Sequence, residues 1–402
     1  MNIYISGISG TGMGALAELA ADARYQVFGS DLVSGAITDE LISKNIDIHI
    51  GPQDGTFLKE VHSKSPIDLF VYTSSLPASH SELVLAQTLS IPTGKREKLI
   101  NAIIKQKHLK LIAISGTHGK TTTTAILIWL LHSLGQNFAH LVGSTLSFAP
   151  AGRYQPGSEY FIYEADEYDR NFLSFHPDLA VIPSVSYDHP DTYPTEQGYQ
   201  SAFATFRAQS QQVIEAIDTF PGLTLPGAIR RHDASLAIAA ALQITDTPLD
   251  HLVNLANLFP GVGRRFEKLA EGIYSDYAHH PEEITATLGI AHNLAKDYKG
   301  LVLIYEPHQN SRQHAVQSSY SSAFTDVDKI FWLPTHLTRE DPSLPVLTPE
   351  QLSSNVKNAT PTVLDQSLAN QIQALRDDNY LILLMAAGPA DAWLRANLPP
   401  AH

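Results

Sequence analysis

Residues 111–124, LIAISGTHGKTTTT, decide the fold of the middle of this chain. Residues 111–115 form a short apolar run that is typical of a buried parallel strand. The glycine-containing stretch 116–121 breaks this run, and the apolar-faced segment 122–134 that follows predicts a helix. A strand, a glycine turn and a helix in this order gather free backbone N–H groups and the positive end of a helix dipole around one space. The stretch therefore predicts an anion site.

Two side chains of the turn make nucleotide phosphates the expected anion. Lys120 adds a mobile positive charge, and Thr121 offers a hydroxyl to a magnesium ion. The turn departs from the usual pattern G-x-x-x-x-G-K-[ST], because Ile114 stands where a glycine is required. The alternative is a glycine-rich turn with a surface lysine, but it does not account for four consecutive threonines, which are poor helix openers unless their hydroxyls are used.

Length and composition exclude several classes of protein. A chain of 402 residues suggests two or three domains, and 44% hydrophobic with 17% charged residues is ordinary for a soluble globular protein. The net charge of −14 argues against a nucleic-acid partner. Cysteine is absent, which excludes disulfides and thiol catalysis. The apolar runs are too short to insert into a membrane and no signal peptide is evident, so we expect a cytoplasmic protein.

The N-terminal residues predict a Rossmann-like βαβ unit. Residues 2–5 and 25–29 read as strands, and between them lies a glycine turn, 7–14, followed by a helix. The glycine spacing is G-x-x-G-x-G, which favours a nucleotide diphosphate over a nicotinamide cofactor. The second strand ends at Ser30 and Asp31, and a third strand, 69–72, is followed by three hydroxyl side chains: Thr73, Ser74 and Ser75. Unless these three residues only form a turn, they line the same crevice as the glycine turn 7–14.

Polar clusters follow two further strands. The strand 160–163 is followed by four carboxylates within six residues, 164–169, which repel one another unless a cation lies among them. The strand 179–185 is followed by Asp188 and His189. Carboxyl ends of parallel strands meet at one edge of a sheet, so Glu164, His189 and Thr121 together predict a magnesium site. Each cluster alone reads as a solvated acidic loop.

The last third of the chain predicts another α/β domain, with strands near 273–274, 301–305, 329–333 and 380–385 and helices such as 281–294. His279 and His280 lie in the loop after the first of these strands, and on their own they read as part of a polar loop.

Five motifs occur in the order found in the Mur ligases, and the chain resembles that family over essentially its whole length. They are GTHGKTTT at 116–123, EADE at 164–167, DHPD at 188–191, RRFE at 264–267 and DYAHHP at 276–281. The resemblance implies an α/β protein with a Rossmann-like domain (1–107) for a UDP-sugar, a P-loop-type ATPase domain with a parallel sheet (108–266) and a Rossmann-like acceptor domain (267–402). It implies an ATP-dependent ligase of peptidoglycan metabolism that uses Mg²⁺ and small-molecule substrates.

The resemblance also assigns residues to roles. Catalytic roles fall to Lys120, Glu164, His189 and Arg265, and the metal ligands would be Thr121, Glu164 and His189. ATP would be held by Gly116, Thr117, His118, Gly119, Lys120, Thr121, Thr122 and Asp276. The UDP-sugar would be held by Gly10, Thr11, Gly12, Met13, Ser30, Asp31, Thr73, Ser74 and Ser75. The acceptor would be held by Tyr277, His279, His280, His308, Asn310 and Arg312.

Two branches of the family fit, and they differ in the acceptor. One joins L-alanine to UDP-N-acetylmuramate, and the other joins the tripeptide L-alanyl-γ-D-glutamyl-meso-diaminopimelate. Gln309, where the alanine branch has an arginine, and Asn310 favour the tripeptide, which we expect as the acceptor, whereas residues 188–193 resemble the alanine branch. The usual adenine-contacting histidine and asparagine are replaced by Ile229 and Arg230, which leaves a weakened UDP-sugar or ATP sensor as a third reading.

Overall fold

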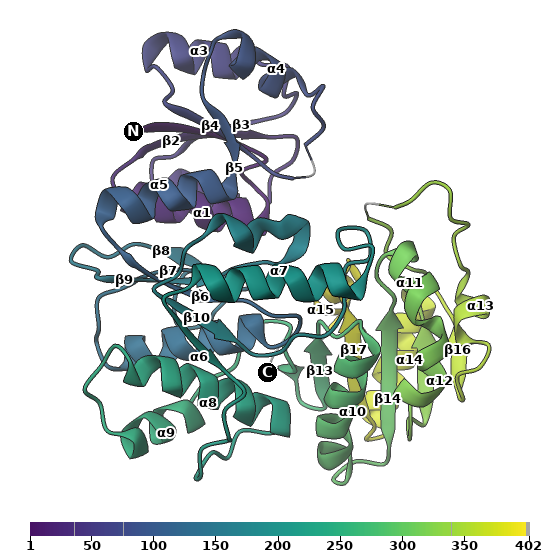
Figure 1. The fold of residues 1–402 in the computed structure, drawn as a ribbon. Coiled ribbons are helices and arrows are strands. Elements are labelled where there is room, and N and C mark those ends of the chain that lie inside the picture. Colours follow the sequence, from purple (N-terminus) through teal and green to yellow (C-terminus); the bar gives the residue numbers. More distant parts are fainter. Residues whose placement is uncertain (36, 75, 339, 399–402) are drawn as a thin grey trace. The chain divides into compact units, whose positions relative to one another are not determined.

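The computed structural model describes residues 1–35, 37–74, 76–338 and 340–398, and it contains three mostly parallel sheets (Figure 1). The chain divides into two compact units. The first comprises residues 1–188, 195–223 and 232–260 and holds the first two sheets; the second comprises 189–194, 224–231 and the residues from 261 onward and holds the third. The expected α/β fold is confirmed, and the domain limits at 107 and 266 stay a prediction.

The first sheet is fully parallel, with strand order β3-β2-β1-β4-β5, so the first strand of the chain is its centre. Its strands are β1 (Asn2–Ser6), β2 (Gln26–Asp31), β3 (Asp47–Ile50), β4 (Leu69–Tyr72) and β5 (Thr93–Lys95). Its helices are α1 (Thr11–Asp22), α2 (Thr38–Ser43), α3 (Thr56–Lys64), α4 (Ser81–Thr88) and α5 (Arg96–Lys107). The consecutive apolar residues of β1 are fully buried, as a strand covered on both faces requires.

The second sheet has the order β11-β10-β6-β9-β7-β8, and the strand before the phosphate turn, β6, lies inside it. Its strands are β6 (Lys110–Ile114), β7 (Ala139–Leu141), β8 (Gly152–Arg153), β9 (Tyr160–Glu164), β10 (Leu179–Ile182) and β11 (Gln212–Glu215). The helical segments are α6 (Lys120–Ser133), η1 (Tyr168–Ser174), α7 (Glu196–Gln209), α8 (Ala228–Leu242) and α9 (Leu249–Asn257). The edge pair β7–β8 is antiparallel.

The third sheet has the order β12-β13-β17-β14-β15-β16, with an antiparallel edge strand, β12. Its strands are β12 (Glu267–Ala270), β13 (Ile273–Asp276), β14 (Leu301–Glu306), β15 (Lys329–Trp332), β16 (Ala359–Pro361) and β17 (Leu381–Ala386). The helical segments are α10 (Pro281–Ala295), α11 (Asn310–Val316), η2 (Gln317–Ser319), α12 (Tyr320–Ala323), α13 (Pro349–Ser353), α14 (Gln366–Asp377) and α15 (Ala390–Asn397).

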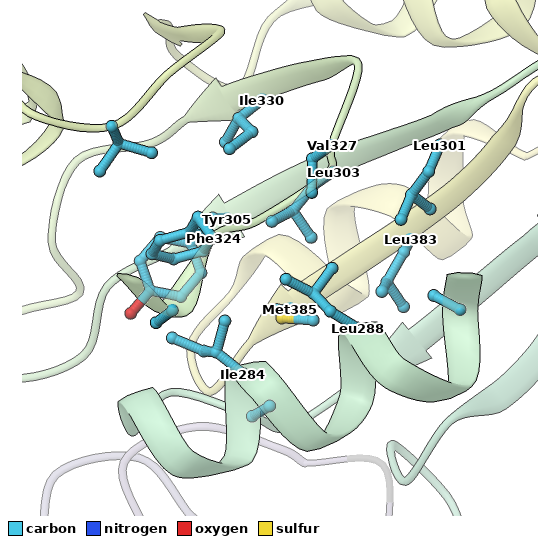
Figure 2. Packing of buried hydrophobic residues seen from close by; sticks show 14 of the residues in the cluster. Ile284, Leu288, Leu301, Leu303, Tyr305, Phe324, Val327, Ile330, Leu383 and Met385 are labelled. Atoms are coloured by element: carbon cyan, nitrogen blue, oxygen red, sulfur yellow. The ribbon is translucent and has the colours of Figure 1, made fainter. Parts of the chain in front are cut away.

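Alternate residues of β14 enter two different apolar layers. Leu301, Leu303 and Tyr305 pack with Ile284 and Leu288 of α10 (Figure 2). Val302 and Ile304 point to the other face, where they pack with residues of α14 and α15. Because both faces of this central strand are covered, its last residue is held in a fixed place at the carboxyl edge of the sheet.

The helix after the phosphate turn begins at Lys120, two residues earlier than the sequence predicted. Gly119 precedes it with a φ of 83°, a left-handed conformation that glycine adopts without strain. The helix therefore starts inside the motif, and Lys120 is its first residue. None of the helices within the described residues is long and apolar enough to cross a membrane.

Candidate functional site

The phosphate turn is held against the end of β10 by hydrogen bonds. The N–H of Thr117 donates to the carbonyl oxygen of Ser184 (3.0 Å), and the N–H of His118 donates to the Ser184 hydroxyl (2.9 Å). A Cβ on Gly116 would lie 2.7 Å from that carbonyl oxygen, so glycine permits the close approach. Since these two amides are engaged, the N–H groups of the first turn of α6 are the better candidates for binding phosphate.

Lys120 is turned back onto its own loop. Its Nζ lies 2.5 Å from the carbonyl oxygen of Gly116 and forms an ion pair with Glu167 (2.8 Å to Oε2). The Glu167 side chain is fully buried. Burial alone would lower the pKa of the Lys120 ammonium, but the carboxylates Glu167, Asp166 and Glu164 outweigh it and raise this pKa above its ordinary value. Lys120 therefore stays charged, with a carboxylate where a phosphate could bind.

The four carboxylates of the acidic stretch are each compensated by groups of the protein itself. Glu164 accepts the hydroxyl of Thr121 (2.7 Å) and the N–H of Gly143 (2.8 Å). Glu167 pairs with Lys120, Asp166 lies 3.4 Å from Nη2 of Arg96, and Asp169 pairs with Lys95. The sequence predicts a cation among these carboxylates, and lysine and arginine side chains supply positive charge there.

Thr121 and Glu164 nevertheless fit a magnesium ion. Their oxygens lie 2.7 Å apart at the start of α6 and the end of β9. Neighbouring ligands of an octahedral Mg²⁺ with bonds of about 2.1 Å are about 3 Å apart, and hydroxyl and carboxylate oxygens are suitable ligands. The predicted third ligand, His189, begins the segment 189–194 of the second unit, with a φ of 58°, and its carbonyl oxygen accepts the N–H groups of Thr192 and Tyr193.

The glycine turn between β1 and α1 is fixed by a carboxylate. Asp31, at the end of β2, accepts the N–H of Ser9 (2.9 Å). Gly10, Thr11, Gly12 and Met13 form the start of α1, where N–H groups lack partners within the helix. The Ser30 hydroxyl donates to the buried carboxylate of Glu82 (2.8 Å), so this hydroxyl hydrogen takes part in a contact within the protein.

The structure places Thr73, one of the three predicted residues after β4, beside this turn. A Cβ on Gly7 would lie 3.2 Å from the Thr73 methyl group, which puts Thr73 next to the turn. Ser74 follows it in the chain, and Ser75 lies outside the described residues.

Arg96 connects the two sheets of the first unit. It is the first residue of α5, and besides its contact with Asp166 its Nη1 lies 3.9 Å from the position of a Cβ on Gly12. The phenol of Tyr163, which is 2% exposed, lies close enough to favour the charged form of Arg96 and raise its pKa. The guanidinium thus lies between the start of α1 and the acidic stretch after β9.

Histidines and an arginine gather at the carboxyl edge of the third sheet. The Nδ1 of His279 lies 3.0 Å from the carbonyl oxygen of Tyr277, and its ring meets the ring of His308 at 5.5 Å. His280 is the N-cap of α10 in a capping box with Glu283. Arg312, 4% exposed, donates from Nη1 to Nδ1 of His308 (3.1 Å).

The burial and the side-chain hydrogen bonds of Asn310 differ from those expected of an acceptor-binding residue. It is 1% exposed, its amide nitrogen donates to the carbonyl oxygen of Pro345 (3.0 Å), and its amide oxygen accepts the N–H of Leu347 (2.9 Å). The side chain therefore anchors the loop before α13.

Arg265 and Asp276 lie together in the second unit. Asp276 accepts the N–H groups of Phe266 (2.6 Å) and Ala278 (2.7 Å), and the guanidinium of Arg265 lies 4.8 Å from the centre of the Tyr277 ring. Burial raises the pKa of Asp276 above its ordinary value, although Arg265 and the N–H of Ala278 oppose the shift. Arg230, at one of the replaced adenine positions, donates to the carbonyl oxygen of Arg265, and Ile229 is 52% exposed.

Comparison with known proteins identifies the family. Residues 2–108 match the Mur ligase family catalytic domain, and residues 114–219 match the Mur ligase middle domain. A UDP-N-acetylmuramate–L-alanine ligase of Clostridium novyi is 30% identical over 393 residues, which cover 84% of this chain and 83% of that protein. The chain belongs to the Mur ligase family. Members of this family form amide bonds and use ATP as a substrate, so the chain is an ATP-dependent ligase.

Solved structures of Mur ligases share the fold of this one. The UDP-N-acetylmuramate–alanine ligase of Thermotoga maritima superimposes with a TM-score of 0.78 at 22% identity, covering 99% of this chain and 98% of that one. The murein peptide ligase of Psychrobacter arcticus gives a TM-score of 0.66 at 22% identity, covering 100% and 99%. Both likenesses concern the fold.

In this Mur ligase the sequence indicated some partners of the phosphate turn and missed others. Thr121 and Glu164 meet directly, as the strand-end argument predicts. Glu167 was noticed within the acidic stretch but given no role, and Arg96 was given no role. Arg96 directly follows β5, at the edge of the first sheet where the other strand ends gather, and that position is the signal that could have indicated it.

Proposed function

We propose that this Mur ligase joins the amino group of an acceptor to the lactyl carboxylate of UDP-N-acetylmuramate, with ATP as the energy source and Mg²⁺ as cofactor. The observation that carries the proposal is the meeting of Lys120, Thr121 and Glu164 at one strand–turn–helix junction. It is supported by the second glycine turn in the same unit, because the start of α1, which follows it, suits the diphosphate of a UDP-sugar. In line with its relatives, we place this reaction in the cytoplasm.

The chemistry follows from charge. A carboxylate and an amine form a salt at neutral pH, so the carboxylate first needs a leaving group. The carboxylate attacks the γ-phosphate of ATP, giving an acyl phosphate and ADP. Lys120 and the N–H groups at the start of α6 counter the repulsion between these two anions, with phosphate oxygens taking the place of Glu167 beside Lys120. Mg²⁺, held by Thr121 and Glu164, would supply further positive charge to the phosphates.

The amine then attacks the acyl carbon and phosphate leaves. Arg265 and Asp276 belong to the unit that carries the acceptor residues, and we assign them to the nucleotide side of the reaction as the family resemblance implies. Because acyl phosphates hydrolyse, we expect water to be excluded before the first step.

For the acceptor we favour L-alanine over the tripeptide. Asn310 favoured the tripeptide in the sequence, but both polar ends of its buried amide bind the loop at Pro345 and Leu347. It is therefore poorly suited to reading an acceptor. The names of the relatives at 27–30% identity, which are UDP-N-acetylmuramate–L-alanine ligases, point the same way. Gln309 remains in favour of the tripeptide, since it lacks the charge that would bind a free amino acid carboxylate.

The test is ADP release by the purified protein with ATP, Mg²⁺ and UDP-N-acetylmuramate, and with L-alanine, the tripeptide or D-alanine as acceptor. We expect L-alanine to give ADP and a product whose mass equals the sum of the two substrates minus water, and D-alanine to give neither. Turnover with the tripeptide alone would assign the chain to the other branch. Absence of ADP with every acceptor would refute the proposed reaction.

A further inference from the structure

A carboxylate without a role in the reaction above lies at the carboxyl edge of the third sheet. Glu306 is the last residue of β14, the strand between β17 and β15, and it is 3% exposed. Its Oε2 accepts the N–H of Gly388 (2.8 Å) in the turn between β17 and α15. A Cβ on Gly388 would lie 2.5 Å from this oxygen and 2.5 Å from Cγ of His336, which places both side chains at the same glycine.

The groups around Glu306 come from several segments of the second unit. The N–H of Gly388 and the guanidinium of Arg264, whose Nη2 donates to the carbonyl oxygen of Ala386 (2.6 Å), favour the charged form of the carboxyl group. Asp391, at the start of α15, disfavours it. The rings of His308 and His336 stack at 5.7 Å beside it. Burial is the largest influence and raises the pKa of Glu306 to about 7.

The proposed reaction needs a group of this kind. An acceptor amine reaches the enzyme mainly as an ammonium ion, because the pKa of an α-amino group is about 8 at the start of a peptide and higher in a free amino acid, whose carboxylate is close by. It must lose a proton before its lone pair can attack. Three imidazoles in the same unit have other partners: His279 bonds to the carbonyl oxygen of Tyr277, His280 caps α10, and His308 accepts from Arg312.

We propose that Glu306 is the base that takes this proton, an inference that rests on the proposed ligase function. The carboxylate of Glu306 accepts one proton from the ammonium group, which leaves a neutral amine. The nitrogen lone pair forms the C–N bond at the acyl carbon, the C–O bond to phosphate breaks, and the second nitrogen proton leaves with the phosphate. The group must be deprotonated to act, so the rate of amide formation rises with pH through the pKa of Glu306.

The experiment compares two nucleophiles in Glu306→Gln. Hydroxylamine is uncharged at neutral pH, so it needs no base to react with the acyl phosphate and form a hydroxamate. We expect Glu306→Gln to lower the rate of amide formation about 100-fold, to leave hydroxamate formation unchanged and to move the rise in amide formation from near pH 7 to the higher pH at which the acceptor amine itself loses its proton. Asp365→Asn is the matched control, because Asp365 is likewise a carboxylate that accepts a backbone N–H, that of Leu368 (2.8 Å), and it is exposed. It should change neither rate.

The other outcomes separate the two proposals. Equal loss of amide and hydroxamate in Glu306→Gln would make Glu306 a structural residue, and an unchanged amide rate would exclude it as the base; either result overturns the inference while the ligase function stands. Absence of hydroxamate with the wild-type protein would mean that no acyl phosphate forms, and both proposals would fall together. Thermal unfolding of the variants identifies a fold that has been lost.

Discussion

The turn between β1 and α1 and the turn between β6 and α6 both lead from a buried parallel strand into a helix that follows a glycine. They differ in charge. The first turn of α1 has no acidic or basic residue, and a carboxylate, Asp31, holds the loop by accepting the N–H of Ser9. The first residue of α6 is Lys120, which stays charged beside Glu167. Backbone N–H groups suffice to bind a phosphate group. Transfer of a phosphoryl group also needs a cation that neutralises the charge developing in the transition state.

This difference predicts where the largest loss of activity lies. Lys120→Ala should lower ADP formation about 1000-fold or more, because Lys120 is the one lysine or arginine among residues 116–121 and so carries the permanent positive charge of this turn. Binding of UDP-N-acetylmuramate, followed by calorimetry, should be unchanged. Lys110→Ala is the control, since Lys110 is an exposed lysine of β6 paired with Glu159. An active Lys120→Ala enzyme would mean that the charge of Lys120 does not distinguish the second turn from the first.

The ion pair of Lys120 gives the second prediction. Glu167→Gln leaves a buried ammonium without its carboxylate, so the free energy of unfolding in urea should fall by about 3 kcal/mol. Mg-ATP should then raise the midpoint of unfolding more in the variant than in the wild type, because phosphate oxygens replace the missing carboxylate. Glu159→Gln removes an exposed partner of Lys110 and should not alter stability. A smaller effect of Mg-ATP in the variant would show that Glu167 helps to bind the nucleotide.

The same two turns indicate how far sequence reasoning reaches. The strand, turn and helix of residues 111–124 could be predicted because the evidence is contiguous, and Glu164 could be placed beside Thr121 because parallel strand ends share an edge. The contact of Arg96 with Asp166 joins residues 70 positions apart on separate sheets, and no periodicity encodes it. Asn310 was assigned to the acceptor by the family resemblance, and its contacts with Pro345 and Leu347 could not be foreseen because these residues lie in a loop without a regular pattern.

The packing of α1 on the second sheet links the two turns within one unit. A Cβ on Gly152, in β8, would lie 1.9 Å from the carbonyl oxygen of Ala15, in α1. Gly152→Ala should therefore lower the free energy of unfolding by about 2 kcal/mol, since backbone must move to admit the methyl group. Gly289→Ala is the control, because a Cβ there would meet nothing within 4 Å in the middle of α10. Unchanged stability of Gly152→Ala would mean that this contact is not kept in solution.

The smallest expected effect belongs to the turn that only holds its ligand. Asp31→Ala removes the carboxylate that fixes Ser9, so the turn loses its preset shape and the KM for UDP-N-acetylmuramate should rise about tenfold. The KM for ATP and the rate at saturating substrate should stay the same, because the interaction is equal in the ground and transition states. Asp54→Ala removes a carboxylate that accepts the N–H of Thr56 in an exposed loop of the same sheet and should change neither constant. If Asp31→Ala instead lowers the rate at saturation, the first turn takes part in the chemistry, and the contrast between a holding turn and a reacting turn fails.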